Sequence, residues 1–167
     1  MSEYMNRMPP LARLKSWLFA LPTAKLIFLA LLATYLGTIP TIVYSLFNPD
    51  AFFGGPHWGK HRIVSMILFA CIVAPLAETA INQWGCLRLL EKLKCRRDVA
   101  VVISAVLFGL GHNYSGSYIV FAFFAGLALA GVFVIEDARG GRPFLVTAAV
   151  HAMRNGISTA ASLLLLP

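Results

Sequence analysis

Residues 63–90 read IVSMILFACIVAPLAETAINQWGCLRLL, and this stretch decides the fold. It exceeds the roughly 20 residues that a helix needs to cross the hydrocarbon core of a bilayer. Its only charged residues are Glu78, deep inside the run, and Arg88, close to its end. A run this long and this apolar predicts a membrane-spanning helix, in which a glutamate is the unexpected residue.

The composition of the whole chain agrees with a membrane setting. Of the 167 residues, 59% are hydrophobic and only 13% are charged, whereas a soluble domain carries about 25% charged residues. The mean hydropathy is +0.75. A soluble protein of this size could not hide so much apolar surface, so lipid must surround much of it. We therefore expect an all-α, polytopic transmembrane helical bundle.

Five apolar spans are expected, at about residues 26–47, 63–90, 99–112, 118–135 and 144–166. Pro40 predicts a kink in the first span, and the third is short for a full crossing. The fifth is expected to break near Gly156, leaving a short terminal helix. Small residues at 122, 125, 126, 130 and 131 predict close helix packing along the fourth span.

The segment before the first span shows a helical pattern of apolar residues. These are Leu11, Leu14, Trp17, Leu18 and Leu21. Their spacing predicts a short N-terminal helix lying in the membrane interface. A frayed cytoplasmic tail is the alternative interpretation.

The formal net charge is +7, and the positions of the basic residues predict the orientation. They cluster before the first span, between the second and third spans, and between the fourth and fifth. The clusters consist of Arg7, Arg13, Lys15 and Lys25; of Lys92, Lys94, Arg96 and Arg97; and of Arg139 and Arg142. The positive-inside rule then gives a cytoplasmic N-terminus and an outside C-terminus. Such short clusters between apolar runs favour contact with lipid head groups and argue against nucleic-acid binding.

Glu78 is the only one of seven acidic residues that lies deep within an apolar run. A carboxylate at mid-bilayer costs about 2.5–3.5 kcal/mol on insertion scales, which makes the residue a functional candidate. The structural alternative is a protonated Glu78 that hydrogen-bonds to a neighbouring helix. With a rise of about 1.5 Å per residue, Glu78 and His112 both lie about 20 Å from the cytoplasmic ends of their spans, and His151 about 13 Å. We expect these three side chains to share one site.

The chemistry that these residue types suggest is the activation of water. A carboxylate in a low-dielectric site can act as a general base near neutral pH, and a histidine can orient the same water. Asn155 lies four residues after His151, so both face one side of a helix and could stabilise an oxyanion. One glutamate and two histidines are also a possible zinc site. The residues alone leave both mechanisms open.

At these positions the chain resembles the CPBP, or Abi, family of intramembrane proteases, which includes the CAAX prenyl endopeptidases. The family carries the motifs E-E-x-x-x-R, F-x-x-x-H and H-x-x-x-N in this order. Here residues 74–83 read APLAETAINQ, residues 108–112 read FGLGH, and residues 151–155 read HAMRN. The second and third motifs match in full, with Phe108 opening the second. The first keeps its leading glutamate.

The resemblance implies roles for individual residues. Glu78 would be the general base and would act with His112 on the attacking water, while His151 and Asn155 would form the oxyanion site. The first motif departs from the family, because Thr79 replaces the second glutamate and Gln83 replaces the arginine. A metal site that needs both glutamates would lose a ligand, so we expect no cofactor. Zinc at Glu78, His112 and His151 is the alternative.

Arg154, inside the third motif, is a candidate replacement for the lost cation. A contact with the surface or with lipid head groups is the alternative role for its side chain. The expected organisation is therefore an N-terminal cytoplasmic or interfacial segment at 1–24, a first span with its outside loop at 25–62, and a protease-like helical core at 63–167.

The sequence predicts a glutamate-type intramembrane endopeptidase that cuts near the C-terminal end of a membrane-associated protein or peptide. We expect it in a bacterial inner membrane. A non-catalytic protein of the same fold, such as a bacteriocin-immunity or scaffold factor, is the second hypothesis. The third is a proton or ion pathway, because intramembrane glutamate and histidine also mark such pathways.

Overall fold

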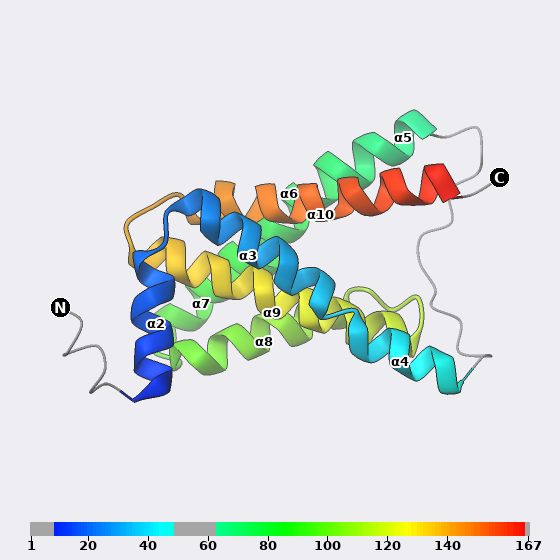
Figure 1. The fold of residues 1–167 in the computed structure, drawn as a ribbon. Helices are drawn as coiled ribbons and strands as arrows, with labels where there is room; N and C mark the ends of the chain where they lie inside the picture. The colour runs from blue at the N-terminus through cyan, green and yellow to red at the C-terminus, as the bar shows by residue number, and fades with distance from the viewer. Residues whose placement is uncertain (1–8, 49–62, 166–167) are drawn as a thin grey trace.

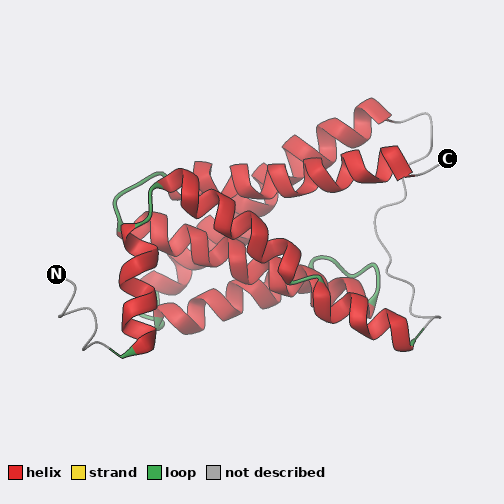
Figure 2. Ribbon diagram, in the orientation of Figure 1, coloured by secondary structure: helices red, strands yellow, loops and turns green. Residues whose placement is uncertain are grey.

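The computed structural model describes residues 9–48 and 63–165 of the chain. In these ranges the secondary structure is helical throughout, with no strand (Figure 2). The elements before the gap are α2 (Pro10–Ala20), α3 (Thr23–Leu36) and α4 (Ile39–Phe47). One continuous helix then comprises α5 (Ile63–Leu68), η1 (Phe69–Val73), α6 (Ala74–Glu78), η2 (Thr79–Gly85) and α7 (Cys86–Lys92). The last three are α8 (Arg97–Leu110), α9 (Gly116–Ala138) and α10 (Pro143–Leu165). The outside loop expected before the second span lies, at 49–62, beyond the described residues.

Three stretches of helix are long and apolar enough to cross a membrane, as expected for an integral membrane protein. They are Thr23–Phe47, Ile63–Lys92 and Gly116–Ala138. The other two expected spans are helical but do not meet both criteria. Helix α8 has 14 residues, which is short of a full crossing. Helix α10 has 23 residues and includes His151, Arg154 and Asn155, which make it more polar.

Helix α9 is the centre of the bundle and packs against α8, α10 and α3. Its inward face supplies Phe121, Leu129 and Val132 to the main apolar core. Helix α3 adds Leu26, and α10 adds Val150. Many large apolar side chains point outward instead, as expected of helices whose solvent is lipid.

The small residues of α9 allow a close helix approach, with one exception. A Cβ atom on Gly126 would lie 3.1 Å from the Cα of Ala105 and from the Cβ of Phe108, both on α8. Ala122, Ala125 and Ala130 are buried in the same bundle. A Cβ on Gly131 would meet no atom within 4 Å. The predicted packing stripe is therefore real at residues 122–130 and does not include residue 131.

The two expected helix breaks turn out differently. The first span does divide, but at Gly37 and Thr38, so Pro40 lies in the first turn of α4. Proline is tolerated there because the first backbone N–H groups of a helix have no intrahelical partner. At Gly37 the backbone comes so close to α9 that an added Cβ would lie 2.7 Å from the Cβ of Phe124. The break expected near Gly156 is absent, since α10 continues through that residue.

Three connecting segments come together at one end of the bundle: those between α2 and α3, between α7 and α8, and between α9 and α10. Helix α2 lies there across the ends of the longer helices (Figure 1). Arg139 donates to the carbonyl of Leu21 and to Thr23, which joins the end of α9 to the start of α3. Glu136, only 1% exposed, pairs with the same arginine and accepts a 3.1 Å hydrogen bond from Thr23.

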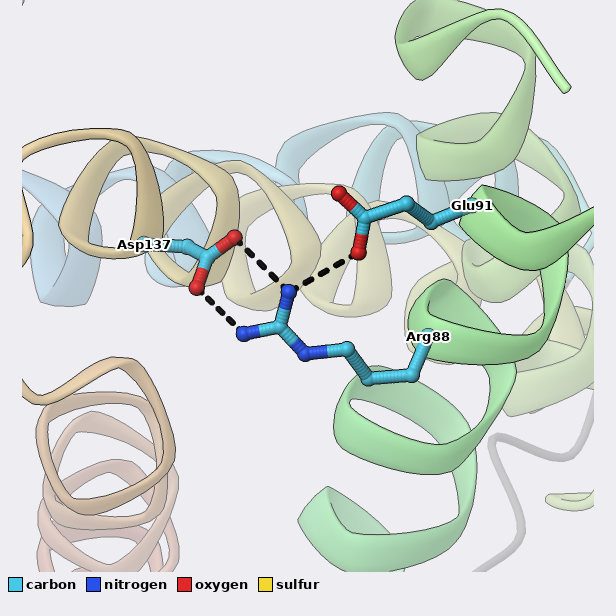
Figure 3. Close-up of polar contacts among 3 residues, drawn as sticks. All are labelled: Arg88, Glu91 and Asp137. Atoms are coloured by element: carbon cyan, nitrogen blue, oxygen red, sulfur yellow. Dashed lines mark hydrogen bonds and ion pairs between the residues drawn. The ribbon is translucent and has the colours of Figure 1, made fainter. Parts of the chain in front are cut away.

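Arg88 makes the second link at this end (Figure 3). Its guanidinium donates to both carboxylate oxygens of Asp137 on α9, and to Glu91 at 2.9 Å. It also lies over the ring of Phe133, 5.8 Å from the ring centroid. The connections α2–α3, α7–α8 and α9–α10, near which basic residues predict the cytoplasmic side, lie together at this end of the bundle (Figure 1).

Candidate functional site

The site begins with the long helix that carries Glu78. Two π-helical stretches, η1 and η2, lie on either side of α6, which holds Pro75 and ends at Glu78. In η1 the N–H of Ala74 donates to the carbonyl of Phe69. The next bond of this register would come from residue 75 to Ala70, but proline has no N–H to give. The proline therefore leaves the Ala70 carbonyl without its helical donor.

Asn155 supplies the missing donor. Its side-chain nitrogen, on α10, lies 2.9 Å from the Ala70 carbonyl oxygen and donates a hydrogen bond to it. This bond fixes the irregular helix against α10 about two turns before Glu78. An amide nitrogen carries two hydrogens, so one donor of Asn155 is still free for another acceptor.

The structure places Glu78 between the two histidines. The Oε2 atom of Glu78 is 3.4 Å from Nε2 of His112 and 3.6 Å from Nε2 of His151. Both distances exceed an ordinary N–H···O hydrogen bond. A water molecule at hydrogen-bond distance from the carboxylate and an imidazole fits such a separation.

His112 is held in one orientation by the end of α8. Its Nδ1 atom lies 2.7 Å from the carbonyl oxygen of Phe108. A carbonyl can only accept, so in this bond Nδ1 carries the hydrogen and the neutral ring presents its Nε2 lone pair towards Glu78. The Phe108 ring also contacts both imidazoles, with centroid distances of 4.5 Å to His112 and 5.4 Å to His151. Phe108 thus positions both rings.

His151 is the more enclosed of the two histidines. It lies on α10 and is only 4% exposed. Its Nδ1 atom is buried, and no described protein group hydrogen-bonds to it. Because Nε2 faces Glu78, a hydrogen on that nitrogen would point at the carboxylate and at any group bound beside it.

A small cavity lies beside these residues, with about 50 Å³ of space for a water-sized molecule. That is more than a single water requires. Its lining comes from α3, α8, α9 and α10 and includes His112, His151, Asn155, Arg154, Tyr118 and Thr34. Polar groups from α3, α9, α10 and the turn after α8 therefore line one small space, and its two histidines face the Glu78 carboxylate.

The two residues that depart from the family motif lie inside the bundle. Thr79 and Gln83 are both 0% exposed. No described protein group hydrogen-bonds to the Thr79 hydroxyl or to either amide atom of Gln83. Neither residue lines the cavity of the histidines. The structure thus buries Thr79 and Gln83 on the helix that carries Glu78, with no side-chain hydrogen bond to a described protein group.

Two aromatic residues of the site had no assigned role in the sequence analysis. The Tyr118 ring stacks on His112 with centroids 5.9 Å apart. Tyr35, on α3, donates a 3.0 Å hydrogen bond from its hydroxyl to the Arg154 carbonyl oxygen. The spacing of Tyr118 with Ala122 and Ala125 at helical intervals was the available signal for the first. Nothing in the sequence ties Tyr35 to α10.

The zinc alternative finds no support in the arrangement of side chains. Within residues 9–48 and 63–165, no group of three His, Cys, Asp or Glu side chains is placed to hold a metal ion.

Fold and site together define a class: a helical membrane protein with a glutamate and two histidines converging beside an internal cavity. A comparison with protein families gives a match over residues 60–157 to "Type II CAAX prenyl endopeptidase Rce1-like". This region covers more than half of the chain and contains all three motifs. The chain belongs to this Rce1-like family. No curated protein and no solved structure matches it.

Proposed function

We propose that this protein is an intramembrane endopeptidase that hydrolyses a peptide bond near the C-terminal end of a membrane-associated substrate. The observation that carries the proposal is the position of the Glu78 carboxylate, 3.4 Å from His112 and 3.6 Å from His151. Membership of the Rce1-like family supports the same reaction class.

Glu78 is the general base in this mechanism. Its carboxylate takes a proton from a water that lies beside it and His112, within hydrogen-bond distance of both, and Nε2 of His112 accepts the water's second hydrogen. The water oxygen forms a bond to the carbonyl carbon of the substrate, and the C=O π electrons move onto the carbonyl oxygen. The proton then passes from Glu78 to the amide nitrogen as the C–N bond breaks. The products are a carboxylic acid and an amine.

His151 and Asn155 stabilise the negative charge on the carbonyl oxygen. A hydrogen on Nε2 of His151 and the second amide hydrogen of Asn155 are the donors for this role. Removing one such donor costs about 10²–10³ in kcat in a well-studied protease. The first amide hydrogen of Asn155 stays on the Ala70 carbonyl throughout.

A cleavage assay in liposomes tests the proposal. The substrates are a farnesylated peptide of the Cys-aliphatic-aliphatic-X type and an unmodified apolar peptide that spans the bilayer. We expect Glu78→Gln and His112→Ala to lose at least 10²-fold in rate. Glu91→Gln is the matched control, since Glu91 lies on the same long helix with its side chain 56% exposed. Undiminished cleavage by either site variant contradicts the mechanism.

Two observations favour a second function, that of a non-catalytic member of the fold. The amide of Asn155 is engaged with the backbone, and Thr79 and Gln83 replace charged residues of the family motif. A protein of this kind would keep its cellular function in the Glu78→Gln variant. Complementation of a deletion strain by that variant therefore separates the two proposals.

A further inference from the structure

The site contains a cation that the proposed mechanism does not use. Arg154 lies on α10 and lines the same cavity as His112 and His151. Its guanidinium carbon is 4.3 Å from the centroid of the Phe121 ring and 5.3 Å from that of the Tyr35 ring. Two aromatic faces therefore hold the planar group, a common environment for arginine.

Most of the hydrogen-bonding capacity of Arg154 is unused. A guanidinium has five N–H donors, and here Nη1 donates to the Ser158 hydroxyl at 3.2 Å. The Nε atom is buried, and no described protein group accepts its hydrogen. An arginine on a helix among apolar helices that leaves a buried donor unmet is costly, so it marks a place where a ligand would bring acceptors.

Three other arginines, unlike Arg154, form ion pairs within the chain. Arg88, Arg96 and Arg139 each pair with a carboxylate of this chain. In the part of the chain that the structure describes, no carboxylate pairs with Arg154. The carboxylate of Glu78 faces the two imidazoles instead. Among the described residues this cation therefore has no paired anion, and it lines a cavity that an anion could enter.

The chemistry of the guanidinium selects the class of anion. Its planar fork matches a carboxylate with two parallel hydrogen bonds. Arg154 follows His151 by three residues, so the two Cβ atoms are neighbours on one helix face, about 5–6 Å apart. An extended peptide advances about 3.3–3.6 Å per residue. A carboxylate held by Arg154 is therefore within a few residues of a peptide bond held at His151.

We propose that Arg154 binds the free α-carboxylate at the C-terminus of the substrate and so places the cut within a few residues of that end. This role rests on the proposed peptidase function, which it deepens by naming how the enzyme measures its distance from the chain end. A phosphate of a lipid head group is the other source of a similar anion, and the experiment separates the two.

Binding, measured without turnover, tests this role. The probe is a fluorescein-labelled, farnesylated Cys-Val-Ile-Ser peptide, made once with a free carboxylate and once as the C-terminal amide. It is titrated onto the Glu78→Gln protein in phosphatidylcholine vesicles, with and without phosphatidylglycerol. We expect the acid to bind at least ten times more tightly than the amide, in both kinds of vesicle.

Three variants on the Glu78→Gln background complete the design. Arg154→Gln lowers binding of the acid to the level of the amide and leaves the amide unchanged, which also shows that the variant is folded. Arg154→Lys keeps part of the preference, because it keeps the charge and loses the fork. Arg142→Gln removes the same charge from an exposed position just before α10 and keeps the full preference.

Two results would overturn the role of Arg154. One is that the acid and the amide bind equally well to the protein that retains Arg154, or that neither binds. The other is an Arg154-dependent retention of phosphatidylglycerol without any preference for the acid, which would assign the residue to lipid. Both results are independent of catalysis, whereas full cleavage activity in Glu78→Gln would contradict the peptidase mechanism alone.

Discussion

Thr79 and Gln83 show how a single pair of residues can depart from a family pattern without opening the fold. They stand where the related proteases carry glutamate and arginine, four residues apart on one helix. Both are fully buried. Charged side chains at such positions are costly unless they pair, and removing one partner of a buried pair costs about 3–5 kcal/mol. Replacing both charges together keeps the helix interior neutral.

This interpretation predicts strong coupling between the two positions. Gln83→Arg alone buries an unpaired cation and should destabilise the protein by several kcal/mol. The double variant Thr79→Glu with Gln83→Arg should recover at least half of that loss, since the two side chains can pair at this spacing. Unfolding in mixed detergent micelles measures the four members of the cycle. Additive effects of the two changes would show that the positions do not communicate.

At the residue scale, the sequence predicted which side chains come together better than it predicted the hydrogen bonds that hold them. Depth along each span placed Glu78, His112 and His151 at compatible levels, and the structure brings them within 3.6 Å of one carboxylate oxygen. The catalytic role of the three stays a prediction. The bond from Asn155 to Ala70 was out of reach, because it depends on a helical register that the sequence pattern does not reveal.

The main irregularity at the scale of elements is the helix that carries Glu78. Its two π-helical stretches sit on either side of the segment with Pro75. π-helical turns are rare and often occur at functional sites. Here the first one has a definite cause, since the proline removes one donor and Asn155 provides another. The helix therefore depends on α10 for its shape just before the glutamate.

A double-mutant cycle tests this dependence. Asn155→Ala leaves the buried Ala70 carbonyl unpaired, and we expect a loss of about 1–3 kcal/mol in unfolding free energy. Pro75→Ala restores a backbone N–H next to that carbonyl. In the Pro75→Ala background the cost of Asn155→Ala should fall by at least half. An equal cost in both backgrounds would mean that Asn155 does not replace the donor that proline lacks.

The contact between α8 and α9 gives a matched pair of glycines. Gly126→Val should cost about 1–3 kcal/mol, because its side chain would press into Ala105 and Phe108. Gly131→Val, on the same helix, changes the intrinsic helix preference equally but meets open space. We expect little loss for the second variant in thermal unfolding monitored by circular dichroism. Similar losses for both would refute the close approach at Gly126.

The helix breaks show how far the sequence predicts where helices begin and end. A proline signals a disturbance, but the actual break of the first span lies at Gly37, where α3 comes close to Phe124. That choice depends on packing between distant segments. Gly156 caused no break, and α10 contacts the long helix on both sides of that residue, from Asn155 to the Ala70 carbonyl and from Thr159 to Cys71. Local propensity alone was a weak guide in both cases.

At the scale of the whole molecule, the connections at one end of the bundle carry linked charges. Arg88 bonds to Asp137, and Arg139 bonds to Leu21 and Thr23. These contacts join α7 to the end of α9, and the residue after α9 to the connection between α2 and α3. Since basic loops stay in the cytoplasm, we propose that this end faces the cytoplasm and that α2 lies along the membrane surface there.

Fusion reporters test the orientation. A C-terminal alkaline phosphatase fusion should be active, and a C-terminal green fluorescent protein fusion should be dark, because the end of α10 would lie outside. Fusions placed after Lys94 should give the reverse pattern. The opposite result at both positions would overturn the orientation that the basic residues predict.

The overall class was predictable because composition and span length are strong signals in membrane proteins. The number of helices that cross the whole membrane was less predictable from the sequence. Helices α8 and α10 are held in the bundle by their contacts with α9, and neither has both the length and the apolarity that identify a span. Helix α8 has only 14 residues, and α10 carries the polar residues of the third motif, so pattern alone could not decide whether either crosses the membrane.

The most direct test of the central claim compares the C-termini of membrane proteins in cells that carry the natural gene or its Glu78→Gln form. The claim is that Glu78 activates the water that cuts a membrane-associated chain near its end. It predicts that one or a few membrane proteins keep a longer C-terminus in the Glu78→Gln cells, and that Glu91→Gln cells match the natural ones. Identical sets of C-termini in natural and Glu78→Gln membranes would contradict it.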